Sequence, residues 1–422
     1  MRSFLISAQS IGRSISRIGA LLVFVVSTSV NANNRDLSES KGSYCLKADT
    51  KDMQKSIAFV LFFLALDSCI ERADFPSDQE NRVDIVVDGA ITNDPGPYTV
   101  KLSRTIQVGS TLGGLTISSA KITMLSDAGE SEQLIETRLP GTYQTSASGI
   151  RGVIGRSYWL EIQLPDGRKF ESLPDQMLPV GRIDSLYHQF ETFVADNGSK
   201  SYGFRIFVNA ETNPQETYTR WRFDGVYAVT TIPKLHPDAP PNNPCPTRPL
   251  PCSGWQILNG QLVSLGPCTC CECWANQFES KPTVRENNGS KVIGLQVGFV
   301  PVNYYTFQDR YRVTVTQMSL SKKAFEYWKT VKDQKDGAVS PFQPAFGKTE
   351  SNIFKRENTG KVVGVFYAAA VTRHKMFIKK ETNNAYLLAE VPVDCTGRAG
   401  PAGQSCLFMF PGSTNIKPAD WD

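Results

Sequence analysis

The sequence predicts an all-β protein with two immunoglobulin-like β-sandwich domains in tandem, of which the second is larger and carries one packed helix. Apolar and polar residues alternate in short runs such as 158–164 and 202–209. Alternation with a period of two is typical of strands that are buried on one face. Turn residues separate these runs at intervals of roughly ten residues, as in β-sandwiches. A convincing helical pattern occurs in one place only.

The first sandwich is expected over residues 82–180. Its predicted strands are 83–87, 98–102, 115–125 and 158–164. Between the first two lies Asp94-Pro95-Gly96-Pro97. Proline fixes φ and glycine permits positive φ, so we expect the chain to reverse or kink there. The segment Leu178-Pro179-Val180-Gly181 marks the predicted boundary to the second domain.

The second sandwich is expected over residues 181–422. Its predicted strands are 183–193, 202–209, 218–230 and 310–317. The helix is predicted to begin at Ser319 or Ser321 and to end at Gln334, because a serine hydroxyl can cap the free N–H groups of a first turn. The apolar stripe of this helix consists of Ala324, Trp328 and Val331, with Phe325 beside it. Such a stripe predicts that the helix packs on the sandwich.

A proline- and cysteine-rich insert at residues 236–274 interrupts the second sandwich. Its many prolines lack backbone N–H donors, so no central strand is expected in its first part. The cysteines of the insert are Cys245, Cys252, Cys268, Cys270, Cys271 and Cys273. In an oxidising compartment these thiols would form disulfides that staple a loop with little core of its own. Alternatively, four thiolates would hold a soft metal such as zinc or copper.

The spacing of these cysteines does not determine how they pair. Two further cysteines, Cys395 and Cys406, lie in the glycine- and proline-rich C-terminal segment. We expect these two to form a separate bridge.

Residues 53–69 have the layout of a lipoprotein signal. Met53 and Lys55 precede an apolar run that is too short to span a bilayer, and the small residue Ser68 precedes Cys69. A buried core helix is the alternative, but polar residues at helical spacing are missing from the run. We therefore expect Cys69 to carry a lipid anchor.

On this interpretation residues 53–68 are a signal peptide and residues 69–81 are a flexible polar tether. The segment 13–32 also resembles a secretory leader. Two leaders in tandem make little mechanical sense, so residues 1–52 are interpreted as an over-extended gene start.

Charge and motif content exclude several function classes. The net charge is +4, and residues 1–68 contribute eight basic and five acidic groups, so the remainder carries about +1. A nucleic-acid-binding protein needs a cationic excess, so this role is not expected. His188, His236 and His374 are too widely separated for a metal or catalytic site.

The enzyme interpretation has little support in the sequence. The chain has no Gly-x-Ser-x-Gly elbow, His-Glu-x-x-His, Walker loop or dinucleotide fingerprint. No catalytic residue, metal or cofactor is therefore assigned. Paired carboxylates of a glycoside hydrolase would leave no spacing signature, so an undetected hydrolase remains an alternative.

An aromatic run provides the only candidate ligand-binding side chains. Tyr304, Tyr305 and Phe307 would serve as stacking residues for a sugar or a peptide if they are exposed. The alternative is that they belong to a buried strand edge.

Residues 87–104, VDGAITNDPGPYTVKLSR, closely resemble the opening signature of the Bacteroidota lipoprotein family known as domain of unknown function 4249, or DUF4249. The resemblance continues through Gly141-Thr142-Tyr143, Gly155-Arg156-Ser157-Tyr158, Asp184-Ser185-Leu186-Tyr187, Tyr218-Thr219-Arg220-Trp221, Cys270-Cys271-Glu272-Cys273-Trp274, 321–328, Gly364-Val365-Phe366 and 415–421. It covers nearly the whole chain after Cys69.

The resemblance implies an outer-membrane lipoprotein whose gene often lies beside that of a TonB-dependent receptor. It carries over no catalytic residue. Asp184-Ser185-Leu186 also resembles the three-residue O-glycosylation site of exported Bacteroidota proteins, which makes Ser185 a candidate modification site.

We therefore expect a non-enzymatic, lipid-anchored accessory at the outer membrane that faces the periplasm or the cell surface. Its expected role is binding or docking with a TonB-dependent receptor in nutrient uptake. A structural or assembly protein of the envelope is the main alternative, and a hydrolase is a weaker one.

Overall fold

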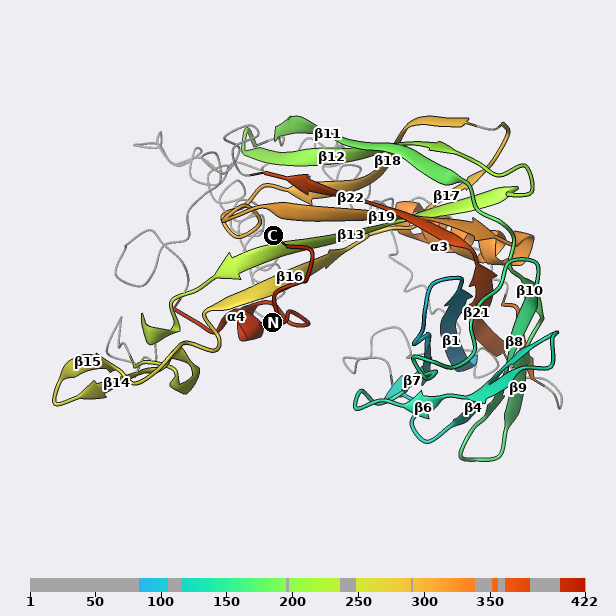
Figure 1. Ribbon diagram of the computed structural model, residues 1–422, viewed down its shortest axis with the longest axis horizontal. Helices are drawn as coiled ribbons and strands as arrows, with labels where there is room; N and C mark the ends of the chain where they lie inside the picture. The colour runs from blue at the N-terminus through green and yellow to red at the C-terminus, as the bar shows by residue number, and fades with distance from the viewer. Residues whose placement is uncertain are drawn as a thin grey trace, which may run out of the picture. The chain divides into compact units, whose positions relative to one another are not determined.

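Figure 1 shows the computed structural model of the chain. The structure describes residues 83–104, 115–194, 197–235, 248–289, 291–337, 351–355, 361–379 and 403–421, all of which belong to one compact unit, Ser77–Asp422. The described part of the chain is mostly β, as the sequence predicts, and four of its five sheets pack in two pairs. Within the described ranges no helix is both long and apolar enough to cross a membrane.

The first pair of sheets contains the strands predicted after residue 82. One sheet has the order β21-β1-β2-β7-β6, with β3 beside β2. Its strands are β1 (Val83–Thr92), β2 (Thr99–Arg104), β3 (Leu115–Thr116), β6 (Ile135–Glu136), β7 (Thr142–Gln144) and β21 (Lys361–Ala369). The other has the order β20-β9-β8-β4-β5, with β10 beside β8. Its strands are β4 (Lys121–Ser126), β5 (Ser131–Gln133), β8 (Ser157–Gln163), β9 (Lys169–Ser172), β10 (Asp175–Gln176) and β20 (Ile353–Lys355).

One apolar cluster fills the space between these two sheets. Val87 and Leu102 come from the first sheet, and Met124, Leu160 and Phe170 come from the second. In β4 and β8 every second side chain is buried, which is the period of two that predicted these strands. Each fully buried side chain of this kind stabilises the fold by about 1.5–3 kcal/mol.

The second pair of sheets is built from the longer strands. One sheet has the order β11-β12-β18 and the other β16-β13-β19-β22, with β17 beside β13. The strands are β11 (Arg182–Val194), β12 (Lys200–Glu211), β13 (Tyr218–Thr230), β16 (Glu272–Phe278), β17 (Thr283–Glu286), β18 (Lys291–Pro301), β19 (Tyr311–Leu320) and β22 (Val371–Ile378). Phe204 and Ile206 of β12 share a buried cluster with Trp221, Phe223 and Val313 of the facing sheet.

The predicted helix is α3 (Lys322–Gly337). Ser321 caps it, because its Oγ accepts a hydrogen bond from the N–H of Ala324 at 3.3 Å, whereas Ser319 belongs to β19. The helix contacts β13, β17 and β19 of the second sandwich and also β21 of the first. The ring of Phe325 stacks on Tyr218 with centroids 4.5 Å apart.

The first sandwich also takes strands from far along the chain. β21 pairs in parallel with β1, with Val87 opposite Gly364, and β20 pairs with β9. The predicted domain boundary at residue 181 does not account for these two strand pairings. Strands that are so far apart in the sequence give no local signal that they will pair. After β21 the chain passes through the buried residue Ala370 into β22 of the second sandwich.

Partly buried hydrogen bonds hold the segment that links the two sandwiches. The hydroxyl of Ser319 donates to the carbonyl of Leu178, and the N–H of Gly181 donates to the Glu216 carboxylate at 2.8 Å. The Glu216 carboxylate also accepts from the hydroxyl of Thr219 at 2.7 Å. A buried carboxylate with several donors is well compensated, so it fixes the path of the linker.

Candidate functional site

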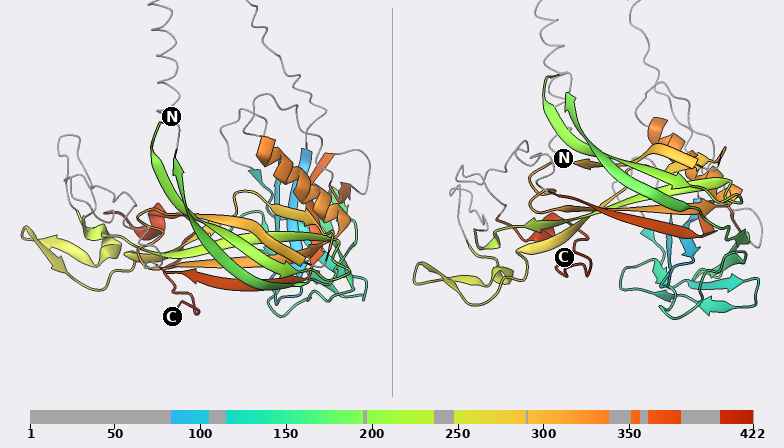
Figure 2. Two further views of the ribbon diagram at one scale, coloured as in Figure 1. Left: turned by 90° about the horizontal axis from the view of Figure 1, so that it is seen from above. Right: turned by 45° about the horizontal axis from the view of Figure 1, so that its top comes forward.

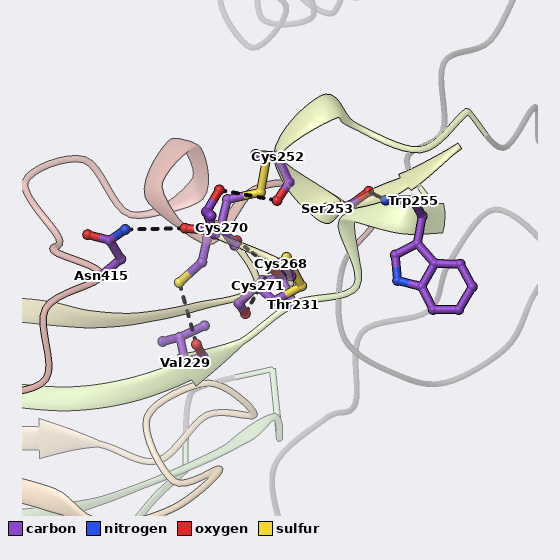
Figure 3. Close-up of a disulfide and its surroundings, with 11 residues drawn as sticks. Val229, Thr231, Cys252, Ser253, Trp255, Cys268, Cys270, Cys271 and Asn415 are labelled. Atoms are coloured by element: carbon purple, nitrogen blue, oxygen red, sulfur yellow. Dashed lines mark hydrogen bonds between the residues drawn. A yellow bond between two sulfur atoms is a disulfide. The ribbon is translucent and has the colours of Figure 1, made fainter. Parts of the chain in front are cut away.

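Three disulfides lie in the described part of the chain, and all use cysteines that the sequence singles out. They are Cys252–Cys270, Cys268–Cys271 and Cys273–Cys406. Figure 3 shows the first two close together. Because these six cysteines are bonded in pairs, they form disulfides and are not thiolate ligands of a metal. Within the described ranges, groups of three or more His, Cys, Asp or Glu with metal-site geometry are absent.

The predicted Cys395–Cys406 bridge is wrong, because Cys406 is bonded to Cys273. The short helix α4 (Cys406–Met409) lies against β16, where the N–H of Cys406 donates to the carbonyl of Cys270 at 3.0 Å. Trp274 and Thr414 exchange two backbone hydrogen bonds nearby. The C-terminal segment thus pairs with β16, and no local sequence pattern predicts this pairing. Cys395 and Cys245 lie outside the described residues.

The insert contains a hairpin that sequence analysis missed. Strands β14 (Trp255–Leu258) and β15 (Gln261–Ser264) form a separate two-stranded sheet. Asn259 and Gly260 form the turn with φ values of 51° and 76°, and an Asn-Gly pair with positive φ is the typical two-residue hairpin turn. That Asn-Gly pair, flanked by apolar residues, was the signal available in the sequence.

The base of the hairpin is held by covalent bonds and by close backbone contacts. The Cys252–Cys270 bridge encloses the whole hairpin. The 3₁₀ helix η3 (Pro251–Ser253) ends at Gly254, whose carbonyl accepts from the N–H of Leu265 at 2.7 Å. The Nζ atom of Lys234, in the 3₁₀ helix η2 (Pro233–Leu235), lies 4.6 Å from the centroid of the Trp255 ring. An isolated two-stranded hairpin is only marginally stable in water, so these links maintain it.

The hairpin is apolar yet exposed. Its exposed apolar residues are Ile257, Leu258, Leu262, Val263 and Leu265, with exposed fractions of 36–59%. Residues of β14 and β15 take no part in the four buried apolar clusters of the described chain. In Figures 1 and 2 the hairpin projects from the end of β13 and β16, at the opposite end of the second sandwich from α3. Ile257 and Leu262 lie directly opposite each other on one face of the hairpin, and Leu258 and Val263 project from the other face. Exposed apolar groups that gather on one element mark interaction surfaces.

A second feature is a pocket of about 350 Å³ where the first sandwich, the second sandwich and α3 meet. Arg220 and Trp328 form part of its wall, and the Arg220 guanidinium carbon lies 3.6 Å from the centroid of the Trp328 ring. Arg220 also forms a buried ion pair with Glu279 and donates to the hydroxyl of Tyr367 at 3.2 Å.

Burial and charge act in opposite directions on this group of side chains. Burial alone would lower the pKa of Arg220, but Tyr367 and Glu279 beside it raise that pKa overall. Burial raises the pKa of Glu279 above its ordinary value, although Arg220 opposes the shift. Both side chains are largely desolvated, so each depends on its partner for charge compensation.

A family model described as a domain of unknown function, DUF4249, matches residues 70–375. The chain belongs to the DUF4249 family. None of the curated proteins matches it. In this DUF4249 protein, the family-like segment Tyr218-Thr219-Arg220-Trp221 supplies the buried arginine of the pocket, and Cys270-Cys271-Glu272-Cys273-Trp274 supplies half of the disulfide cysteines at the base of the hairpin.

The predicted stacking residues of this DUF4249 protein lie in different environments. Phe307 is buried in the second core, 5.4 Å from Phe204 between ring centroids, so its assignment as a ligand-stacking residue is wrong. Tyr304 and Tyr305 are half-buried and contact each other edge to face. The ring of Tyr305 also packs on Phe410. These three aromatic side chains therefore serve mainly in packing. The sequence pattern could not show which of the rings points into the core.

The remaining predicted sites have simpler outcomes. Ser185 lies half-buried in β11, where its Oγ accepts from the side-chain amide of Asn209 at 2.9 Å, and its glycosylation stays a prediction. Cys69 lies outside the described residues. His188 packs edge to face on Phe204, and burial lowers the pKa of its imidazole. His374 lies in β22, and His236 is outside the described ranges.

Proposed function

We propose that this protein is an exported, lipid-anchored accessory of the outer membrane that docks on a TonB-dependent receptor through the β14–β15 hairpin. The observation that carries the proposal is the set of five exposed apolar side chains on a hairpin held by disulfides instead of by a core. The proposed role is non-enzymatic.

The hairpin has the physical properties of a docking element. Its apolar side chains gain free energy when a partner removes them from water. Each strand of a two-stranded sheet has one outer edge, and a partner segment can extend the sheet there by backbone hydrogen bonds. Because the disulfides restrict the base of the hairpin, less conformational entropy is lost when it binds.

The disulfides also support export. Structural disulfides persist in oxidising compartments such as the periplasm and the cell surface. The family match begins at residue 70, directly after Cys69, which agrees with Cys69 being the first residue of the mature chain. A lipid on this cysteine would place the protein at the membrane that holds the receptor.

The experiment is affinity purification of the tagged full-length protein from detergent-solubilised membranes of the native host. We expect one receptor barrel to co-purify with the wild-type chain. Substitution of Ile257→Lys or Leu262→Lys places a charge on the hairpin and should abolish the co-purification. Ile293→Lys is the matched control, because Ile293 is an equally apolar, 79% exposed side chain on β18, away from the hairpin.

Retention of the receptor by both hairpin variants would contradict docking through the hairpin. A broad mixture of envelope proteins that is independent of the hairpin would instead support a structural role.

A further inference from the structure

The pocket between the sandwiches presents a row of polar side chains from three strands. Arg222 of β13 lies directly opposite Thr316 of β19, and Thr316 lies directly opposite Arg373 of β22. Residues opposite each other on antiparallel strands point to the same face with Cβ atoms about 4.5–5.5 Å apart. All three line the pocket. The two guanidinium groups therefore flank one hydroxyl on the pocket wall.

The other walls complete a concave site. Asp88 of β1 and Lys101 of β2 are a directly opposite pair on the first sandwich. Trp328 of α3 supplies an aromatic wall. Binding sites often lie where domains meet, and the volume of about 350 Å³ suits a small organic molecule.

Three buried donors of the pocket's lining residues lack partners among the described residues, and one of them is Nε of Arg220. Thr316 is 2% exposed, and its Oγ1 makes no hydrogen bond there. The indole Nε1 of Trp328 is likewise buried without a partner. Buried polar atoms are almost always hydrogen-bonded in native proteins, so these orphaned donors in one pocket point to a ligand that brings hydrogen-bond acceptors to them.

The arginines retain free donor capacity. Arg222 donates from Nε to Asp224 at 2.9 Å, and Arg373 pairs with Asp94. Each guanidinium has five N–H donors, so one carboxylate partner leaves several for a ligand. Asp224 and Asp94 do not line the pocket. Asp88 is the only acidic side chain among the lining residues. Partial burial lowers the pKa of Arg373 below its ordinary value.

We propose that this pocket binds a small organic oxyanion, with its carboxylate or phosphate group held between Arg222 and Arg373. The hydroxyl of Thr316 donates to the same group, and the N–H of Trp328 contacts the remainder of the ligand. Guanidinium forks match the geometry of both oxyanions, and Arg220 is unsuited to this role because Glu279 already binds it. The site is independent of the docking hairpin.

The test is isothermal titration calorimetry of the disulfide-intact chain from Cys69 onward, with inorganic phosphate in one arm and citrate in the other. Sodium chloride at matched ionic strength is the reference. We expect saturable one-site binding in at least one arm, and the arm that binds identifies the oxyanion class. Arg222→Gln and Arg373→Gln should each weaken binding at least tenfold, and Thr316→Val should weaken it less.

Arg156→Gln is the matched control, because Arg156 pairs with Glu130 at 3.1 Å on the surface of the first sandwich and is not among the residues that line the pocket. This variant should bind as the wild type does. Because Arg222 and Arg373 are 47% and 41% exposed, their replacement should leave folding intact, which circular dichroism checks. Heats equal to those of chloride in both arms, or equal binding by all variants, would overturn the proposal.

Discussion

Arg220 of β13 and Trp328 of α3 are in cation–π contact, with the guanidinium carbon 3.6 Å from the centroid of the indole ring. The contact joins the second sandwich to the helix that also packs on β21 of the first. On its other side Arg220 pairs with Glu279 in a site where the two side chains are only 7% and 15% exposed. The junction of the two sandwiches therefore contains a buried charge pair.

Removal of one member of this pair should strongly destabilise the protein. Glu279→Ala leaves the buried charge of Arg220 uncompensated, and we expect the free energy of unfolding to fall by about 3 kcal/mol or more. Urea unfolding measures the change. Glu130→Ala, which breaks the exposed pair with Arg156, is the control and should lower it by at most about 1 kcal/mol. Equal effects of the two substitutions would contradict the buried role of Arg220.

The stability should also depend on pH through Asp175. This carboxyl is buried beside α3 and β21, and it accepts from the N–H of Ala368 at 2.9 Å. Burial raises its pKa above the ordinary value, although Ser321 and Ala368 oppose the shift. The folded state therefore retains the proton longer than the unfolded state does. Its stabilising contribution is complete below the unfolded pKa of about 3.9 and is lost as the pH rises through the folded pKa.

Asp175→Asn removes this titration. We expect the unfolding free energy of the variant, relative to the wild type, to increase as the pH rises from 3 to 8. Urea unfolding at a series of pH values tests the trend, and parallel profiles for the two proteins would show that Asp175 does not titrate as inferred.

The disulfides should differ in their contribution to stability. Cys273–Cys406 joins residues 133 positions apart, whereas Cys268–Cys271 joins residues only three positions apart. In the chain-entropy model, loss of the long-range bridge should cost about 5 kcal/mol and loss of the short one less than about 2 kcal/mol. Double Cys→Ala variants of each pair, compared by chemical denaturation, check this order. The reverse order would mean that the pairing of the C-terminal segment with β16 does not need its covalent link.

A glycine at the base of the hairpin should control its order. Gly254 has a φ of +72°, and an added Cβ would lie 2.2 Å from the carbonyl oxygen of Gly266. Gly254→Ala should therefore increase amide hydrogen exchange at Leu265 and Gly266, with little change in global stability, because the hairpin is outside the buried clusters. Gly260→Ala is the control, since its φ is +76° but no atom would lie within 4 Å of the Cβ. Exchange that rises equally in both variants would exclude the steric explanation.

Cys69 should be the modified N-terminus of the native protein. Mass spectrometry of material from the native host should find a diacylglyceryl group on this residue, and Cys69→Ser should release the protein from the membrane. A soluble cytosolic product with reduced thiols would contradict both the anchor and the oxidising location.

Local patterns in the sequence account for much of this fold. Strand β8 follows from alternation, and α3 follows from Ser321 and an apolar stripe. Local patterns could not predict the partners of β21 and Cys406. These partners are β1 and Cys273, and both lie far away in the sequence.

The sites were less predictable than the strands. Disulfides were expected from the cysteine content and the predicted export signal, but the pocket was not. Arg222, Thr316 and Arg373 lie on three different strands, and only the register of those strands makes them neighbours. Phe307 shows the opposite error. Its sequence context was compatible with an exposed ligand-binding side chain, but the side chain is buried in the core.

The passage of the chain from β21 through Ala370 into β22 has a practical consequence for dissecting this molecule. A fragment that stops at residue 180 would lack β20 and β21, leaving β1 and β9 with unpaired edges and part of the first core open to water. Recombinant work on the amino-terminal half therefore needs residues 351–369 supplied as well, for example by fusing them through a designed connection.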